Sequence, residues 1–203
     1  MIKTQKFLAI NSAQGACSVA VGEPNEIIAC METKMERGHS DVLFPIIDDV
    51  LKNSSLKINQ LDGFFVCTGP GNYTSLRIAV SAVRGLALAG NKPAIGMTLF
   101  ELLTEKRDNC LVIIQGPVDK VYIQKFHDGV KVMKPKLIGI SELMEMQELS
   151  GVTIIGFKAK EVAKAVGGLA SVKETKVSFK RIFSLGFSKL ELPHNRPSPL
   201  YVR

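Results

Sequence analysis

Residues 61–90 read LDGFFVCTGPGNYTSLRIAVSAVRGLALAG, and this stretch decides the fold class. The apolar run from Leu61 to Cys67 predicts a short buried strand. The turn-forming residues 68–72, TGPGN, follow it, and apolar residues then recur at helical spacing from Tyr73 to Ala89. A strand, a glycine-rich turn and a helix in this order are typical of an α/β protein.

Three short apolar segments precede this unit. They cover residues 7–11, 16–21 and 26–31, and polar or turn-forming residues separate them. Such closely spaced runs predict an antiparallel meander of three strands. The meander would add antiparallel strands to the sheet of the strand–turn–helix unit, so the sheet is expected to be mixed.

Two predicted helices carry more apolar residues than one buried face requires. In the first, residues 41–55 after an expected cap at Ser40, the core stripe is Leu43, Ile47, Val50 and Leu51, and the apolar residues outside it are Val42, Phe44 and Ile46. In the second, residues 73–89, the core stripe is Leu76, Val80, Val83 and Ala87. Its small residues form another side, on which a second helix could approach closely: Ser75, Ala79, Ala82 and Ala89.

The rest of the chain alternates between predicted strands and helices. The expected order is strand 93–96, helix 98–106 capped by Thr98, strands 110–115 and 120–126, helix 141–147 capped by Ser141, strand 152–156 and helix 158–166. We therefore expect an α/β protein of two lobes with a mixed sheet in each. The lobes are placed at residues 1–104 and 105–203, and we leave open that the C-terminal segment returns to the first lobe.

Composition excludes several classes of protein. The 203 residues are 46% apolar and 22% charged, which argues against a disordered chain. No apolar run reaches the roughly 18 residues of a membrane helix, and no signal-like stretch opens the sequence, so we expect a cytoplasmic protein that does not contact a membrane. Residues 1–104 hold 9 basic and 9 acidic side chains, whereas residues 105–203 hold 17 and 10 and account for the whole net charge of +7.

Residues for metal or nucleophilic chemistry are scattered. The four cysteines and three histidines match no metal-binding or redox spacing, and no G-x-S-x-G elbow is present. His39, Ser40 and Asp41 are adjacent and cannot form a catalytic triad, because its three groups must converge from different directions. Asn11 ends the first strand, where an amide cannot act as a general base. We expect no catalytic residue, metal or cofactor.

The glycine-rich turn allows two interpretations. Gly69 and Gly71 could turn backbone amides outward at the start of a helix, which would hold a phosphate. Thr74 in the first turn of the helix, with Asn11 and Ser12 at the end of the first strand, would complete a vestigial nucleotide site. The motif is neither a Walker A sequence nor G-x-G-x-x-G, since Thr74 stands at the third glycine position. The alternative is a tight strand-to-helix turn with Thr74 as the cap.

Four segments together resemble the TsaB (YeaZ) family: FLAINSAQGACSVAV at 7–21, RGHSDVLFPIIDDVL at 37–51, the block at 61–103 and PSPLYVR at 197–203. The resemblance implies the two-lobed fold of actin, sugar kinases and heat-shock ATPases, with the second lobe reduced. It also implies a role beside TsaD, the subunit that transfers a threonylcarbamoyl group to the tRNA adenosine next to the anticodon.

The resemblance implies a subunit without catalysis. TsaD binds metal through an H-x-x-x-H pair, and Leu99 and Leu103 stand at the corresponding positions here. An aspartate is usual in the family where this chain has Asn11, and the usual Asp-Ala-Arg of the second lobe is replaced by residues 115–117, QGP. Each of these differences removes a charged or metal-binding group from the expected cleft.

The resemblance further implies that helices 39–52 and 73–89 pack against the equivalent pair of TsaD. The expected interface residues are Val42, Ile46, Ser75, Ala79 and Ala82. Expected partners are TsaD, the small ATPase TsaE and tRNA within the complex, with a homodimer when the chain is alone.

Two other function classes stay open at this stage. The first is an independent enzyme, either an ATP-dependent small-molecule kinase or a glycoprotease-like hydrolase. The second is a stand-alone RNA-binding protein that uses Lys158, Lys160 and Lys164, although 6% aromatic residues offer little stacking surface.

Overall fold

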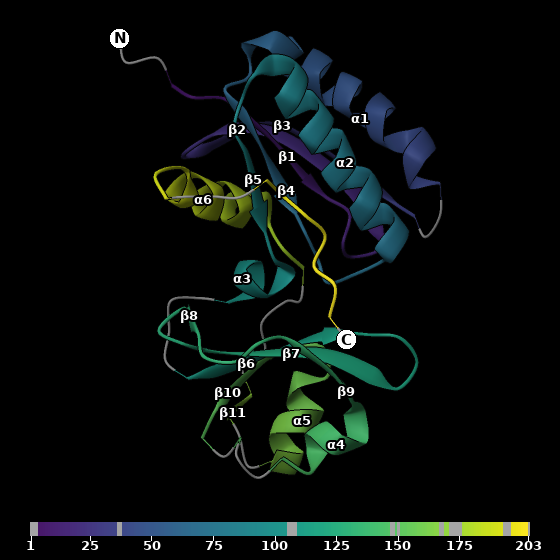
Figure 1. Cartoon of the computed structure of the whole chain (residues 1–203), viewed down its shortest axis with the longest axis vertical. Coiled ribbons are helices and arrows are strands. Elements are labelled where there is room, and N and C mark those ends of the chain that lie inside the picture. The colour runs from purple at the N-terminus through teal and green to yellow at the C-terminus, as the bar shows by residue number, and fades with distance from the viewer. Residues whose placement is uncertain are drawn as a thin grey trace. The chain divides into compact units, whose positions relative to one another are not determined.

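Each half of the chain is built on its own mixed β-sheet (Figure 1). The computed structural model describes residues 4–35, 38–104, 109–146, 149, 151–166, 169–170, 176–192 and 196–202. Contacts divide the chain into a first unit, residues 1–99 and 178–200, and a second unit, residues 100–177 and 201–203. Among the residues described, no helix combines the length and the apolar content that crossing a membrane requires.

The first sheet has five strands in the order β3-β2-β1-β4-β5. Their bounds are β1 Phe7–Asn11, β2 Ala16–Glu23, β3 Glu26–Lys34, β4 Gly63–Cys67 and β5 Ala94–Met97. The first three form the predicted antiparallel meander, β4 pairs with β1 in parallel, and β5 pairs with β4 in parallel. This combination confirms the predicted α/β class with a mixed sheet.

Two helices, α1 (His39–Asn53) and α2 (Tyr73–Gly90), cover one face of the first sheet (Figure 1). A short 3₁₀ helix, Ile58–Gln60, follows α1. The residues of both predicted core stripes are buried, and all of them except Leu76 belong to one hydrophobic cluster. The predicted cap at Ser40 is wrong: α1 begins at His39, two residues before the predicted start, its N-cap is Gly38 in a left-handed conformation, and the Ser40 hydroxyl donates to Asp41 instead.

The opposite face of the first sheet is covered by α6 (Phe179–Leu190), which the sequence analysis did not predict. Phe65 of β4 lies against Phe183 and Phe187 of α6, and Phe7 of β1 stacks on Phe65 at 4.5 Å between ring centroids. These contacts bring residues 178–200 into the first unit. The sequence-based division placed residues 105–203 in the second lobe but left open this return of the C-terminal segment.

The second sheet follows the order β11-β10-β6-β7-β8, with β9 also paired to β7. Its strands are β6 Cys110–Gln115, β7 Lys120–His127, β8 Val130–Lys131, β9 Lys136–Gly139, β10 Thr153–Gly156 and β11 Leu169–Ala170, and its helices are α4 Ile140–Met144 and α5 Ala159–Val166. The helix α3, Leu99–Leu103, follows β5. It is shorter than the predicted helix 98–106, of which residues 105–106 lie outside the described residues.

One predicted cap in the second unit is also wrong. The N-cap of α4 is Gly139 and no side chain caps it, so Ser141 is the second residue of the helix. The helix ends at Met144, before the predicted end at residue 147, which is outside the described residues.

The charge division changes once the chain is folded. Because residues 178–200 return to the first unit, that unit carries 13 basic and 9 acidic residues, and the second unit carries 13 and 10. The excess of +7 is therefore shared almost equally between the two units, and the expectation that the second lobe carries all of it is wrong. The returning segment contributes four of the basic residues of the first unit, among them Arg196.

Candidate functional site

The glycine-rich turn between β4 and α2 satisfies its own helix terminus. Asn72 is the N-cap, and its side-chain oxygen accepts hydrogen bonds from the backbone N–H groups of Thr74 and Ser75, both at 3.1 Å. These N–H groups are among the four that a helix start leaves free for an anion. Asn72 and not Thr74 is therefore the cap, and two of the donors of the expected phosphate site already have an acceptor.

Asn11 and Ser12 lie against the first turn of α2. The Ser12 hydroxyl donates to the carbonyl of Ser75 at 3.0 Å, and the Ser75 hydroxyl lies 2.7 Å from the carbonyl of Ser12. The Asn11 side-chain oxygen accepts from the backbone N–H of Ala13 at 3.1 Å. The structure thus brings the end of β1 and the start of α2 together, as predicted, but through hydrogen bonds among their own groups.

Close packing accounts for both glycines of the turn. A Cβ at Gly71 would overlap the backbone carbonyl of Ala13. Gly69 has φ +92°, in the left-handed region, and a Cβ there would lie 2.5 Å from Cδ1 of Leu76. Glycine is needed at both positions because the turn presses on its neighbours. The glycine pattern therefore does not by itself indicate a phosphate site.

Four of the five predicted interface residues are buried in the interior of the first unit. Ile46, Ser75, Ala79 and Ala82 are buried, and Val42 is half-buried. The reason is that α1 and α2 pack against each other, so that Ile46, Ala79 and Ala82 share one core cluster. The small residues permit close packing of the two helices within the chain. These four side chains are therefore not exposed to a partner, contrary to the prediction.

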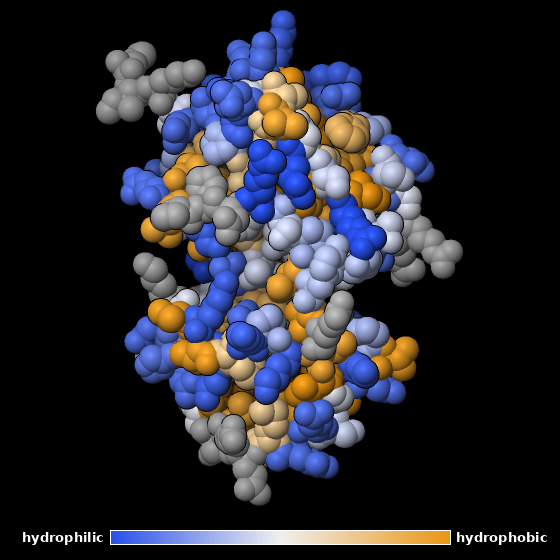
Figure 2. Space-filling view, in the orientation of Figure 1, coloured by the Kyte–Doolittle hydropathy of each residue, from blue (hydrophilic) through white to orange (hydrophobic). Residues whose placement is uncertain are grey.

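The solvent-facing sides of the two helices carry a different set of residues. We define the outer α1–α2 surface as the exposed residues Asp41, Phe44 and Asp48 of α1 and Tyr73, Arg77 and Ser81 of α2. Phe44 and Tyr73 are each 50% exposed, and the Arg77 guanidinium lies 3.9 Å from the centre of the Tyr73 ring. Figure 2 shows apolar residues among polar ones in the upper right region, where Figure 1 places these helices.

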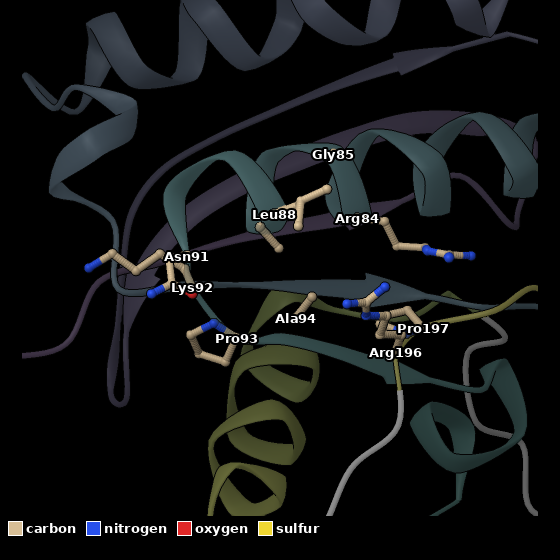
Figure 3. A pocket seen from close by; sticks show the side chains of 10 residues that line it. Arg84, Gly85, Leu88, Asn91, Lys92, Pro93, Ala94, Arg196 and Pro197 are labelled. Carbon is tan, nitrogen blue, oxygen red and sulfur yellow. The ribbon is translucent and has the colours of Figure 1, made fainter.

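A groove of about 470 Å³ lies at the C-terminal end of α2 (Figure 3). We call it the basic groove and define it by its lining residues, which are Arg84, Gly85, Ala87, Leu88, Asn91, Lys92, Pro93, Ala94, Arg196 and Pro197. No local sequence pattern indicates this groove, because its two segments are about 100 residues apart in the chain. All of its residues belong to the first unit.

The other candidate groups offer little for catalysis. Among the described residues, no three His, Cys, Asp or Glu side chains gather as a metal site. Burial raises the pKa of the Cys17 and Cys110 thiols, which disfavours a nucleophilic thiolate. Lys158 of the proposed RNA face forms an ion pair with Glu161 at 3.4 Å, while Lys160 and Lys164 are exposed.

Comparison with known protein sequences finds similar proteins that are named for the threonylcarbamoyl modification of tRNA adenosine. Residues 28–187 match the family model "TsaD: tRNA N6-adenosine threonylcarbamoyltransferase". The TsaB protein of Escherichia coli K12 is 28% identical over 162 residues, which cover 72% of this chain and 68% of that protein. The TsaB of Haemophilus influenzae is 30% identical over 130 residues, 59% of this chain and 52% of that protein. The aligned regions span about half to two thirds of these relatives' lengths.

Solved structures show the same fold over the whole chain. YeaZ from Pseudomonas aeruginosa matches with a TM-score of 0.74 at 18% identity, covering 98% of this chain and 100% of that one. The ethanolamine utilization protein EutJ from Carboxydothermus hydrogenoformans matches with 0.53 at 8% identity, covering 90% of each chain. The predicted two-lobed α/β fold of the actin and sugar-kinase type is thereby confirmed. Since the family model covers well over half of its residues, the chain belongs to the TsaD family, in the group of the TsaB (YeaZ) proteins.

Proposed function

We propose that this chain is a non-catalytic subunit in the synthesis of tRNA threonylcarbamoyladenosine. The observation that carries the proposal is the match to TsaB proteins, which are named for this biosynthesis, over as much as 72% of the chain. In this role the chain binds TsaD and holds it in its active arrangement, within a complex that also takes up TsaE and tRNA. When TsaD is absent, the same surface joins two copies of the chain.

The local chemistry supports a role without catalysis. The Asn11 amide is held by the N–H of Ala13 and carries no charge with which to hold magnesium or take up a proton. Leu99 and Leu103, at the positions that the family resemblance gives to the metal-binding histidines of TsaD, are buried leucines. The amides and hydroxyls at the start of α2 bond to neighbouring protein groups, so little polar capacity is left there for a nucleotide phosphate.

The outer α1–α2 surface supports a role in binding protein. Phe44 and Tyr73 are large side chains held half in solvent on the outside of two packed helices, and aromatic residues are enriched in interfaces. The α1 part of the surface carries the carboxylates of Asp41 and Asp48, and the α2 part carries the Arg77 guanidinium. In a two-fold dimer, α1 of one copy facing α2 of the other would bring opposite charges together.

Replacing Phe44 with aspartate tests the surface. The change removes an aromatic anchor and adds a carboxylate beside Asp41 and Asp48 on the outer side of α1, so the affinity for TsaD should fall at least about 30-fold, in the range of an interface hot spot. Isothermal titration calorimetry with purified TsaD measures the change. Because Phe44 is 50% exposed, the variant should melt within a few degrees of the wild type.

The matched control is Val118→Asp, at an apolar residue that is 89% exposed in the turn between β6 and β7 of the second unit. It introduces the same charge and should leave the affinity for TsaD unchanged. A wild-type affinity of the Phe44→Asp variant would remove Phe44 from the interface. Replacing Ala79 or Ala82 with arginine is not a usable test, because both positions are buried and the charge would unfold the first unit.

Reconstitution tests the function itself. TsaD, TsaE, the threonylcarbamoyl-AMP synthase and tRNA are combined with and without this chain, and modified adenosine is measured by mass spectrometry. Modification should require the chain and should fall with the Phe44→Asp variant. An equal yield of modified tRNA in its absence would contradict the proposed role.

A further inference from the structure

The basic groove combines three cationic side chains with an apolar floor. Figure 3 shows Arg84 and Arg196 at one end and Lys92 at the other, with Pro93 and Ala94 between them. Leu88, 75% exposed, points from α2 toward this floor. Arg84, Leu88 and Arg196 are exposed, so the groove offers both charge and apolar area to a bound molecule.

The charges of the groove have no counterpart within the described part of the chain. The side chains of Arg84, Lys92 and Arg196 make no hydrogen bond or ion pair with any described residue, and none of the residues lining the groove is acidic. The negative end of the α2 dipole faces the same region, but it amounts to only about half a charge. Two of its carbonyls, those of Ala87 and Leu88, already accept from Lys92 and Asn91. The groove is therefore strongly positive.

The chain terminus that supplies Arg196 is held in place. Pro197 is buried, and a Cβ at Gly96 of β5 would lie 3.2 Å from Pro197 Cβ, so the returning segment passes close to the edge strand. Three residues further on, the backbone N–H of Leu200 donates to the carbonyl of Thr68 at 2.8 Å. These contacts fix the segment on the first unit and place Arg196 opposite Arg84 on α2.

We propose that the basic groove binds the phosphodiester backbone of the tRNA, an inference that rests on the proposed function. An arginine guanidinium group can donate two parallel hydrogen bonds to two oxygens of one phosphate, and a lysine ammonium group adds a point charge. Cations at both ends of an open groove suit consecutive phosphates better than one small anion, and the floor between them can take the apolar side of a ribose. An acidic peptide would also bring apolar side chains and backbone amides that need partners, and the groove lining has only one uncharged polar side chain, that of Asn91.

The test uses the triple variant Arg84→Gln, Lys92→Gln and Arg196→Gln. Binding of fluorescent tRNA is measured by anisotropy at several salt concentrations, for the isolated chain and for its complex with TsaD. Each phosphate contact contributes about 0.7 to 0.9 to the slope of log affinity against log salt, so the slope should become shallower by about 2 to 3. At low salt the affinity should fall roughly tenfold or more.

The matched control is the triple variant Lys158→Gln, Lys160→Gln and Lys164→Gln, at the residue before α5 and at two positions on it, which removes the same charge and should keep the wild-type slope. An unchanged slope in the groove variant, or an equal loss in both variants, overturns the proposal. So does polyglutamate binding that depends on the groove while tRNA binding does not, because the occupant would then be an acidic peptide.

Binding of TsaD by the groove variant separates the two proposals. If TsaD still binds and the slope is unchanged, the groove proposal fails and the proposed function stands. If the variant loses TsaD, the groove is a protein contact and the groove proposal fails. If the wild-type chain does not bind TsaD, the proposed function fails, and the tRNA titration of the isolated chain still decides the role of the groove.

Discussion

The two faces of the first sheet are covered in different ways. On one face, α6 lays Phe183 and Phe187 against Phe7 and Phe65 of the sheet, with ring centroids 5.0 to 5.9 Å apart between helix and sheet. On the other, α1 and α2 cover an aliphatic cluster (Figure 1). They leave large apolar side chains such as Phe44 partly in solvent.

This difference indicates that the α6 face serves mainly the stability of the first unit, whereas the α1–α2 face also presents a surface for binding. Aromatic side chains beneath a single helix bury a large area per residue and fix the returning segment on the first unit. Two helices side by side bury their small and aliphatic residues on the sheet and on each other, which leaves their outer sides available. We therefore expect substitutions on the α6 face to change stability and substitutions on the outer α1–α2 surface to change binding.

Phe65→Ala should produce the largest change in stability, because it removes the side chain on which α6 packs. Phe65 is fully buried and its ring contacts those of Phe7, Phe183 and Phe187. Truncating such a residue removes its transfer free energy and leaves a cavity, so the free energy of unfolding should fall by about 3 to 5 kcal/mol. Urea denaturation followed by circular dichroism measures it.

Phe44→Ala is the matched truncation on the other face. Because the Phe44 side chain is half in solvent and lies outside the buried cluster, its removal should change the free energy of unfolding by about 0.5 kcal/mol or less. Similar losses in the two variants would contradict the division between the faces.

Two helical glycines allow a finer comparison of the faces. A Cβ at Gly186 of α6 would lie 2.7 Å from the Phe65 ring, whereas one at Gly85 of α2 meets nothing within 4 Å. Gly186→Ala should therefore destabilise the protein by about 1 to 3 kcal/mol through overpacking. Gly85→Ala should stabilise it by about 0.5 to 1 kcal/mol, because alanine has the higher helix propensity.

Thermal unfolding of both glycine variants measures this difference. The two midpoints should move in opposite directions. A stabilised Gly186→Ala protein would show that the ring of Phe65 can move aside, and that the α6 face is less tightly packed than its ring contacts indicate.

Local patterns in the sequence predict most of the first sheet and both of its large helices, because each depends on spacing within a short segment. The core stripe at Leu43, Ile47, Val50 and Leu51 is buried as predicted. The signal for α6 was present in Phe179, Phe183 and Phe187, which recur every four residues after the cap Ser178. Its place on the first sheet could not be predicted, since only the folded chain brings Phe183 to Phe65.

The candidate site was less predictable, because it depends on contacts between segments that are distant in the sequence. Helical spacing shows that a helix has surplus apolar residues, but it does not show whether a neighbour inside the chain covers them. Ile46 and Ala79 are covered in this way, while Phe44 is not. The basic groove depends on Arg196 lying opposite Arg84, a contact between segments that no local pattern connects.

The smallest expected effect lies at the start of α2, where the outer surface and the core meet. Asn72→Ala removes the acceptor for the N–H groups of Thr74 and Ser75, so the free energy of unfolding should fall by about 1 kcal/mol. Asn72→Asp keeps the acceptor and adds a negative charge at the positive end of the helix, so it should match or slightly exceed the wild type. If Asn72→Ala instead bound ATP or phosphate tightly in calorimetry, the cap would be what keeps an anion site closed. A plain loss of stability without binding would show that the turn serves only to join β4 to α2.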